Sequence, residues 1–115
     1  GICLGMQILF EFSEEGSQKG LEIIPGKVVK FDNDECHVGW NIVESTDDSI
    51  LSQRAGFYFN HSYKADCEDK YVYGYSHYQK KFPVIVNSQN FYGLQFHPEK
   101  SQNAGMHILN NLIQE

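Results

Sequence analysis

Apolar and polar positions along the 115-residue chain follow two different periods. Apolar residues recur at helical spacing from residue 4 to about residue 15, which predicts an amphipathic helix there. The same spacing returns between Met106 and Ile113 and predicts a second helix, with Ser101 as a plausible N-cap. Between these two segments the pattern is that of strands and turns. The predicted order is therefore helix, several strands, helix.

The central segments alternate with the period of strands or are rich in aromatic and β-branched residues. A loop is predicted over residues 16–26, and turns are predicted at 32–34 and 88–90 because glycine, proline, asparagine and aspartate gather there. No repeat, low-complexity stretch or linker interrupts the pattern, so one compact unit is expected. The predicted strands are 27–31, 40–44, 57–59 and 71–78, followed by a hairpin of 83–86 and 91–96.

Composition narrows the possible functions. Eight Phe, seven Tyr and one Trp supply material for a core, which argues against a disordered chain. The net charge of −6, with no basic run, argues against electrostatic binding to nucleic acid or to an anionic membrane. No apolar stretch approaches the roughly 20 residues of a membrane helix. Three widely spaced cysteines indicate a reducing compartment, and hence the cytoplasm.

The first seven residues carry the strongest local signal for chemistry. Gly1-Ile2-Cys3-Leu4-Gly5 has the form of a nucleophile elbow, in which small residues flank a nucleophile at a sharp turn. Glycine at positions 1 and 5 is expected to relieve the steric collision of that turn. The elbow would place the sulfur at a helix N-terminus that favours the thiolate, with the Leu4 N–H as an oxyanion donor. The alternative is a cysteine that packs as a small apolar residue.

A second signal lies in the segment Gly93-Leu94-Gln95-Phe96-His97-Pro98-Glu99. Pro98 keeps the preceding His97 extended, and on an extended chain His97 and Glu99 point to one face. The carboxylate could then fix the imidazole tautomer and leave the other nitrogen for a nucleophile. The alternative is an ordinary surface pair of histidine and glutamate.

Together, Cys3, His97 and Glu99 form a set of nucleophile, base and orienting residue in that chain order. This order resembles the class I (triad-type) glutamine amidotransferases, whose GxCxGxQ and FHPE motifs both occur here unbroken. Further segments are similar to the glutaminase subunits of imidazole glycerol phosphate synthase. These segments are GLEIIPGKV at residues 20–28, HVGWN at 37–41, FNHSY at 59–63 and the lysine of HPEKS at 97–101.

The resemblance implies an α/β fold of the flavodoxin-like type, with a mixed central sheet flanked by helices. It also implies that residues 1–115 are the C-terminal portion of a single amidotransferase domain. The N-terminal strands and the segment with the second oxyanion donor are then expected to be missing, so the chain alone is expected to be inactive.

The resemblance further implies a reaction. Cys3 would attack the side-chain amide of glutamine, His97 would transfer the protons, and Glu99 would orient His97. Gln7 and the segment His61-Ser62-Tyr63 would hold the substrate glutamine. The glutamyl thioester would be hydrolysed to glutamate, and no cofactor would be required.

The resemblance also implies a partner, a (β/α)₈-barrel cyclase that receives the ammonia in histidine biosynthesis. Trp40, Tyr58 and Lys100 match positions that face this partner. Their alternative roles are core aromatics and a solvated charge.

Other functions stay open at this stage. A paralogous amidotransferase could supply ammonia to a surface-sugar pathway, and a cysteine peptidase or other acyl hydrolase could share the elbow. A non-catalytic interaction module is a third class. A metal site is not expected, because Cys36 and His37 are adjacent and no CxxC, HxxxH or HExxH spacing occurs.

Overall fold

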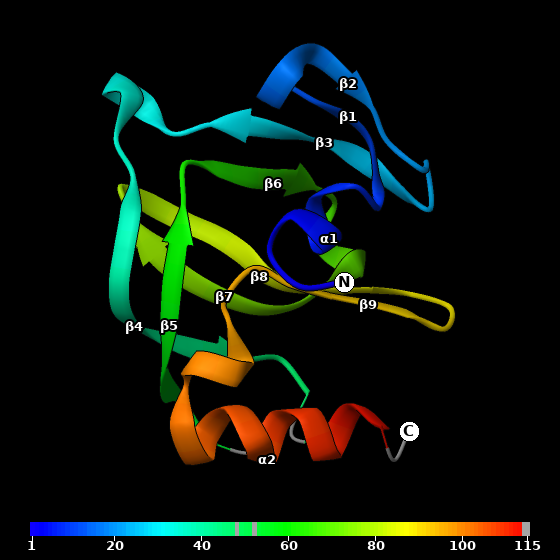
Figure 1. Ribbon diagram of the computed structural model, residues 1–115. Coiled ribbons are helices and arrows are strands. Elements are labelled where there is room, and N and C mark those ends of the chain that lie inside the picture. The colour runs from blue at the N-terminus through cyan, green and yellow to red at the C-terminus, as the bar shows by residue number, and fades with distance from the viewer. Residues whose placement is uncertain (48, 52, 114–115) are drawn as a thin grey trace.

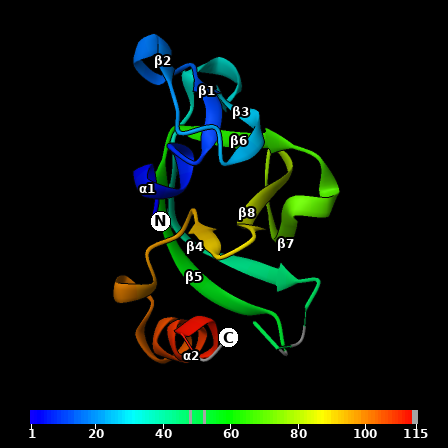
Figure 2. The same ribbon diagram turned by 90° about the vertical axis from the view of Figure 1, so that its right-hand side faces the viewer.

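The computed structural model describes residues 1–47, 49–51 and 53–113. It contains two sheets, with α2 beyond the far end of the larger sheet (Figures 1 and 2). No helix in the described part of the chain is long and apolar enough to cross a membrane. The elements are α1 (Leu4–Gln7), β1 (Phe10–Ser13), β2 (Gln18–Lys19), β3 (Ile24–Lys30), β4 (His37–Ser45), β5 (Ala55–His61), β6 (Tyr63–Cys67), β7 (Val72–Tyr78), β8 (Lys80–Ser88), β9 (Phe91–Leu94) and α2 (Gln102–Ile113).

The smaller sheet has the strand order β2-β1-β3-β6, and the larger sheet has the order β5-β4-β7-β8-β9. Strands β1 and β3 are parallel, whereas the other neighbouring strands within the two sheets are antiparallel. Ile2 forms a parallel bridge with Leu94, which places the start of the chain beside β9. This bridge brings the two ends of the sequence that carry the candidate chemistry to one place.

Strand β5 shows why the alternating pattern produces a sheet with one buried face. Phe57, Phe59 and His61 are buried, while the residues between them are more exposed. Burying a phenylalanine side chain stabilises the fold by roughly 1.5–3 kcal/mol, so this alternation sets which face of the sheet packs inward. The larger core cluster also contains Phe31, Val43, Ile50, Leu51, Phe82, Val84, Ile85, Leu94, Phe96 and Ile108.

The predicted strands are confirmed, with longer bounds, and the predicted hairpin is β8 and β9. The predicted helix over residues 4–15 is wrong beyond its first turn, because the chain enters β1 at Phe10. Phe10 is fully buried and β1 pairs with β3, so a non-local pairing prevails over the local helical spacing. The predicted loop over 16–26 contains β2 and the start of β3.

Ser101 precedes α2 as predicted for an N-cap. Its hydroxyl nevertheless makes its described hydrogen bonds to the His97 carbonyl oxygen and the Tyr58 N–H, not to the helix. The side chain therefore connects α2 to two other segments.

Candidate active site

Cys3 lies at a sharp turn between the bridge at Ile2 and the first residue of α1. Its φ of 54° and ψ of −108° are a conformation that residues with a side chain rarely adopt. The Cys3 N–H donates to the Leu94 carbonyl oxygen at 2.7 Å, and the Leu94 N–H donates to the Gly1 carbonyl oxygen at 2.8 Å. The strand-to-helix elbow predicted from the sequence is therefore present, and β9 supports it.

The two glycines of the elbow differ in what they do. A Cβ on Gly1 would lie 2.2 Å from the Gly5 carbonyl oxygen, so only glycine fits at position 1. A Cβ on Gly5 would meet no atom of the described residues within 4 Å. The prediction that both glycines relieve a collision is right for Gly1 and wrong for Gly5.

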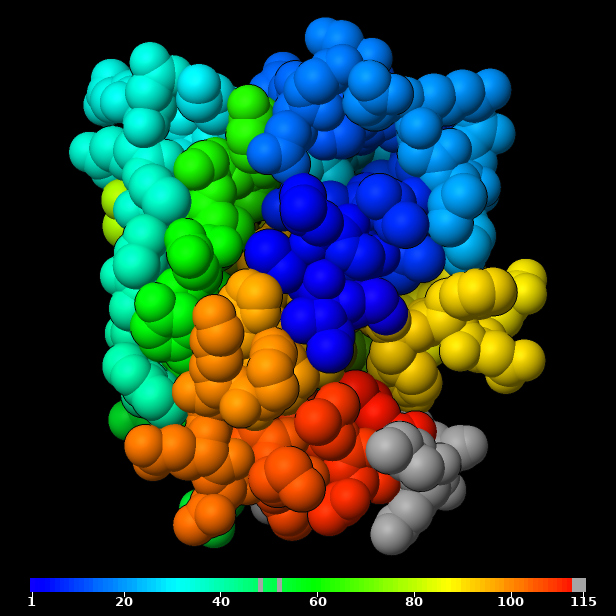
Figure 3. Space-filling model, in the orientation of Figure 1, coloured from blue at the N-terminus to red at the C-terminus, as the bar shows by residue number. Residues whose placement is uncertain are grey.

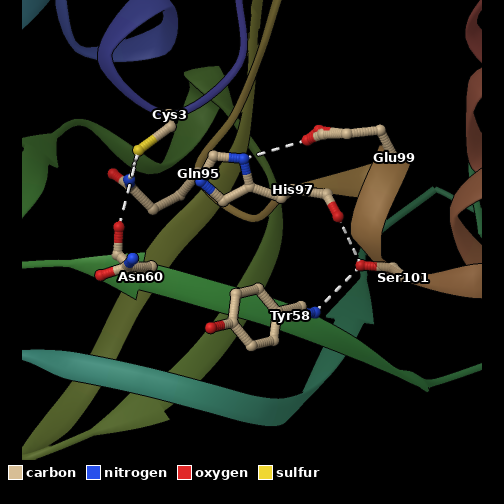
Figure 4. Close-up of polar contacts among 7 residues, drawn as sticks. All are labelled: Cys3, Tyr58, Asn60, Gln95, His97, Glu99 and Ser101. Atoms are coloured by element: carbon tan, nitrogen blue, oxygen red, sulfur yellow. Dashed lines mark hydrogen bonds and ion pairs between the residues drawn. The ribbon is translucent and has the colours of Figure 1, made fainter.

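The Cys3 thiol is directed toward β5 and the end of β9 (Figure 4). Its Sγ lies 3.8 Å from the Asn60 carbonyl oxygen and 3.7 Å from Nε2 of Gln95. Burial raises the pKa of the thiol, and the negative charges of Glu15 and Glu99 raise it further, while the Leu4 N–H lowers it. The Leu4 N–H thus faces the sulfur, as an oxyanion donor requires.

The expectation that the elbow favours the thiolate is therefore wrong for the free protein. Helix α1 has only four residues, so few aligned peptide dipoles point at the sulfur. The burial of Cys3 and the two nearby carboxylates outweigh that dipole, and the pKa of the thiol rises.

His97 and Glu99 form the predicted pair, although the backbone between them differs from the expectation. His97 is extended, but Pro98–Lys100 form a 3₁₀ turn that brings the Glu99 carboxylate back toward the ring. The distance from Nδ1 of His97 to Oε1 of Glu99 is 3.0 Å. Because a carboxylate accepts the hydrogen bond, Nδ1 carries the proton and Nε2 is left as an acceptor.

The three predicted catalytic residues gather on one side of the molecule. Figure 3 shows the start of the chain in blue, the end of β5 in green and the segment after β9 in orange meeting on this face. In the described residues no hydrogen bond joins Cys3 to His97, and Gln95 approaches the sulfur instead (Figure 4). Catalytic hydrogen bonds of this kind often form only once substrate is bound.

A cavity of about 230 Å³ opens beside Cys3. Its lining contains every residue predicted to hold a substrate. The lining residues are Cys3, Leu4, Gln7, Glu15, Asn60, His61, Ser62 and Tyr63. His97 and Glu99 are outside this lining, so the nucleophile faces the cavity and the base lies next to it.

Gln7 is the most informative residue of the cavity. Its Nε2 donates to the Tyr63 carbonyl oxygen at 3.3 Å and to Oε1 of Gln95 at 3.1 Å. Its Oε1 is buried and has no hydrogen-bond partner among the described residues. A buried acceptor without a partner is unfavourable, so this oxygen is suited to receive a donor from a bound ligand.

His61 is held by a chain of hydrogen bonds that the sequence did not indicate. Its Nδ1 lies 2.7 Å from the Tyr63 carbonyl oxygen, and its Nε2 lies 2.9 Å from Nδ1 of His37. Nδ2 of Asn41 lies 3.1 Å from Nε2 of His37. The carbonyl can only accept and the amide nitrogen can only donate, so the tautomers of both rings follow. Burial lowers the pKa of each histidine to about 4.

Both ring nitrogens of His61 are therefore engaged within the protein. Its ring holds the shape of the segment that borders the cavity. The opposition of His37 and His61 in the register of β4 and β5 brings the two rings together. Gln95, Ser101 and Asn60 are further residues that only the structure places at the site.

The residues predicted to face a partner form a surface cluster, here called the aromatic surface cluster and consisting of Trp40, Tyr58 and Lys100. Trp40 is 55% exposed and lies opposite Tyr58 in the register, with ring centroids 6.2 Å apart. Nζ of Lys100 lies 5.9 Å from the centre of the Tyr58 ring. Trp40 is thus not a core residue.

A larger cavity of about 710 Å³ shares no lining residue with the cavity at Cys3. It contains Cys67, whose pKa is raised to about 11, chiefly by burial. That thiol is protonated at neutral pH and has no histidine in the lining around it, so the chemistry points to the smaller cavity. No group of three or more His, Cys, Asp and Glu in the described residues is arranged to hold a metal ion.

Comparison with known proteins agrees with these observations. The family model of the class-I glutamine amidotransferases matches residues 1–115. The chain belongs to this family. The predicted resemblance is therefore confirmed, and the elbow of the amidotransferase chain is that of Cys3.

Curated relatives of this amidotransferase chain include subunits named HisH of imidazole glycerol phosphate synthase. The protein of Staphylococcus epidermidis is 44% identical over 115 residues, which are 98% of this chain and 58% of that protein. The protein of Methanocaldococcus jannaschii is 44% identical over 121 residues, which are 99% of this chain and 62% of that protein. The chain thus spans about three fifths of the length of these relatives.

A solved structure confirms the predicted fold class. The crystal structure of a putative GMP synthase component from Thermoplasma acidophilum has a TM-score of 0.61 to this amidotransferase chain at 21% identity. The match covers 77% of this chain and 47% of that chain. In the part described here, the family's α/β fold is represented mostly by antiparallel strands and by α2.

Proposed function

We propose that the protein containing this chain hydrolyses L-glutamine to glutamate and ammonia. Cys3 is the nucleophile, His97 the general acid and base, and Glu99 the residue that orients His97. One observation carries the proposal: a cysteine in a strained elbow borders a small cavity, next to a histidine whose Nδ1 is already bonded to a carboxylate. This is the arrangement that nucleophilic acyl transfer requires.

The reaction begins with transfer of the thiol proton. Because burial raises the pKa of Cys3, the thiolate is generated when Nε2 of His97 takes the proton during the reaction. The thiolate attacks the side-chain amide carbon of glutamine, and the Leu4 N–H donates to the developing oxyanion. His97 then returns the proton to the departing ammonia, and water hydrolyses the glutamyl thioester. This sequence requires the Cys3 thiol to turn from Asn60 and Gln95 toward His97.

The size and polarity of the cavity favour a free amino acid as substrate. At about 230 Å³, the cavity is smaller than the roughly 300–1,000 Å³ of sites for drug-sized ligands. The unpartnered Oε1 of Gln7 can accept a hydrogen bond from an amide or ammonium group of glutamine. Both observations favour glutamine over a peptide, and hence an amidotransferase over the peptidase alternative.

We further propose that the ammonia is passed to a (β/α)₈-barrel cyclase in histidine biosynthesis. The relatives at 44% identity are named as subunits of imidazole glycerol phosphate synthase, which supports this pathway over the surface-sugar alternative. The exposed aromatic surface cluster supports docking of the partner next to His97. Three unpaired cysteines support a reducing, cytoplasmic location.

Replacement of the nucleophile tests the proposal. In the full-length protein with its cyclase, Cys3→Ala should lower glutamine hydrolysis by more than about a thousandfold, because the acyl bond has no alternative nucleophile. Synthesis from added ammonium salt should remain. The matched control is Cys36→Ala, which removes an exposed thiol away from the cavity and should leave glutamine hydrolysis intact. Glutaminase activity that survives Cys3→Ala would exclude the assignment.

A further inference from the structure

Ser101 occupies a position that the proposed reaction does not yet use. Its side chain is buried, and its Oγ lies 2.6 Å from the His97 carbonyl oxygen and 2.9 Å from the Tyr58 nitrogen. The His97 N–H donates to the Tyr58 carbonyl oxygen at 2.9 Å. Figure 4 shows the hydroxyl of Ser101 between the two backbones. Three hydrogen bonds thus join three segments of the chain.

The direction of each hydrogen bond in this ring is determined. The Tyr58 N–H can only donate and the His97 carbonyl can only accept, so the Ser101 hydroxyl accepts from Tyr58 and donates to His97. An alanine at this position would leave both backbone groups without that partner. Among the standard side chains of this size, only a hydroxyl fulfils both roles well.

The ring also covers the edge of the larger sheet. Strand β5 is the edge strand of that sheet, and its Tyr58 backbone groups point away from β4 toward the segment that carries His97. An edge strand without such cover exposes its N–H and carbonyl groups. Ser101 therefore connects the backbone of β5 with the backbone of the proposed general base.

A second observation shows that this junction has little freedom. A Cβ on Gly105 in the first turns of α2 would lie 1.8 Å from the Pro98 carbonyl oxygen. Helix α2 therefore rests directly against the turn that follows His97. Nδ1 of His97 is bonded to Glu99 on the same turn, so ring and backbone of His97 are both fixed from this side.

We propose that Ser101 is a positioning residue that holds the His97 backbone against β5 and couples the general base to the aromatic surface cluster. The proposal rests on the proposed function for the role of His97. The Tyr58 side chain lies with Trp40 and Lys100, while the Tyr58 backbone is bonded to His97 and Ser101. A partner that contacts Tyr58 thus moves or steadies His97 through Ser101. This supplies a route by which partner binding brings His97 to Cys3, to which no described hydrogen bond joins it in the free protein.

The test compares Ser101→Ala with Ser76→Ala in the full-length protein. Ser76 is also fully buried, and its hydroxyl donates to a backbone carbonyl, that of Ile42. Ser101→Ala should lower the kcat of partner-stimulated glutaminase by about tenfold and reduce the stimulation by the partner to a similar degree. The KM for glutamine should change little, because Ser101 lies outside the substrate cavity. Ser76→Ala should change neither kcat nor the stimulation.

Two further measurements keep the proposal testable. Ser101→Cys keeps the size of the side chain and weakens both hydrogen bonds, so it replaces Ser101→Ala if that variant does not fold. Amide hydrogen exchange should be faster at Tyr58 in the Ser101 variants than in Ser76→Ala. Equal kcat, stimulation and Tyr58 exchange in the variants at both serines would overturn the proposal. Absence of glutaminase activity in the unaltered protein would instead overturn the proposed function.

Discussion

The hydrogen-bonded pair of His37 and His61 predicts how the stability of the protein changes with pH. Each ring is buried and its pKa is lowered to about 4, chiefly by burial, whereas a histidine in an unfolded chain titrates near 6.5. Between these two values the unfolded state binds more protons than the folded state. The free energy of unfolding therefore falls as the pH is lowered from about 6.5 toward 4.

The magnitude follows from the two pKa values. For one histidine that titrates near 6.5 when unfolded and near 4 when folded, the loss between pH 7 and pH 4.5 is about 2 kcal/mol. The rings are 2.9 Å apart at their nitrogens, so the pair titrates as a coupled unit and the two losses do not simply add. A loss of this size is a large fraction of the roughly 5–15 kcal/mol typical of a folded domain.

Urea denaturation of the full-length protein at pH 7 and pH 4.5, followed by far-UV circular dichroism, measures this loss. The comparison variant is His37→Gln, which offers a donor and an acceptor but does not titrate. Because carboxylates titrate equally in both proteins, the difference between them isolates His37, and the variant should lose about 2 kcal/mol less. Equal losses in the two proteins, or NMR titration of His37 and His61 near 6.5, would refute the reasoning.

Two further substitutions test the elbow and the partner surface. Gly1→Ala should destabilise the full-length protein by at least about 1–3 kcal/mol, because its Cβ would overlap the Gly5 carbonyl oxygen, whereas Gly56→Ala meets only an ordinary contact of 3.8 Å. Thermal unfolding of both variants decides this, and an unchanged Gly1→Ala protein would contradict the elbow geometry. Trp40→Ala should weaken binding of the cyclase at least tenfold in a titration, whereas Phe91→Ala, an exposed aromatic on β9, should not. Equal affinities would exclude Trp40 from the interface.

The local parts of the site could be predicted from the sequence. Gly1 and Cys3 define the elbow because the sterics of a sharp turn involve only neighbouring residues. The pairing of His97 with Glu99 follows from their closeness in sequence, although the chain reaches it through a 3₁₀ turn. Alternation of apolar and polar residues likewise located the strands, because the period of two is a property of the extended backbone.

Features that depend on distant segments were decided by the tertiary structure. Helical spacing continues past Gln7, but pairing of β1 with β3 ends the helix there, and no local pattern contains that pairing. The raised pKa of Cys3 depends on burial and on Glu15 and Glu99, of which the elbow motif holds no trace.

The polar network around the site has the same origin. His37 meets His61 through the register of β4 and β5, and Ser101 meets Tyr58 across 43 positions of the sequence. A serine before a helix predicts a cap when only neighbouring residues are considered. Its hydroxyl bonds elsewhere because burial against β5 presents it with the Tyr58 N–H on one side and the His97 carbonyl oxygen on the other. Sequence thus determines what each side chain can donate or accept, and long-range packing determines which groups it reaches.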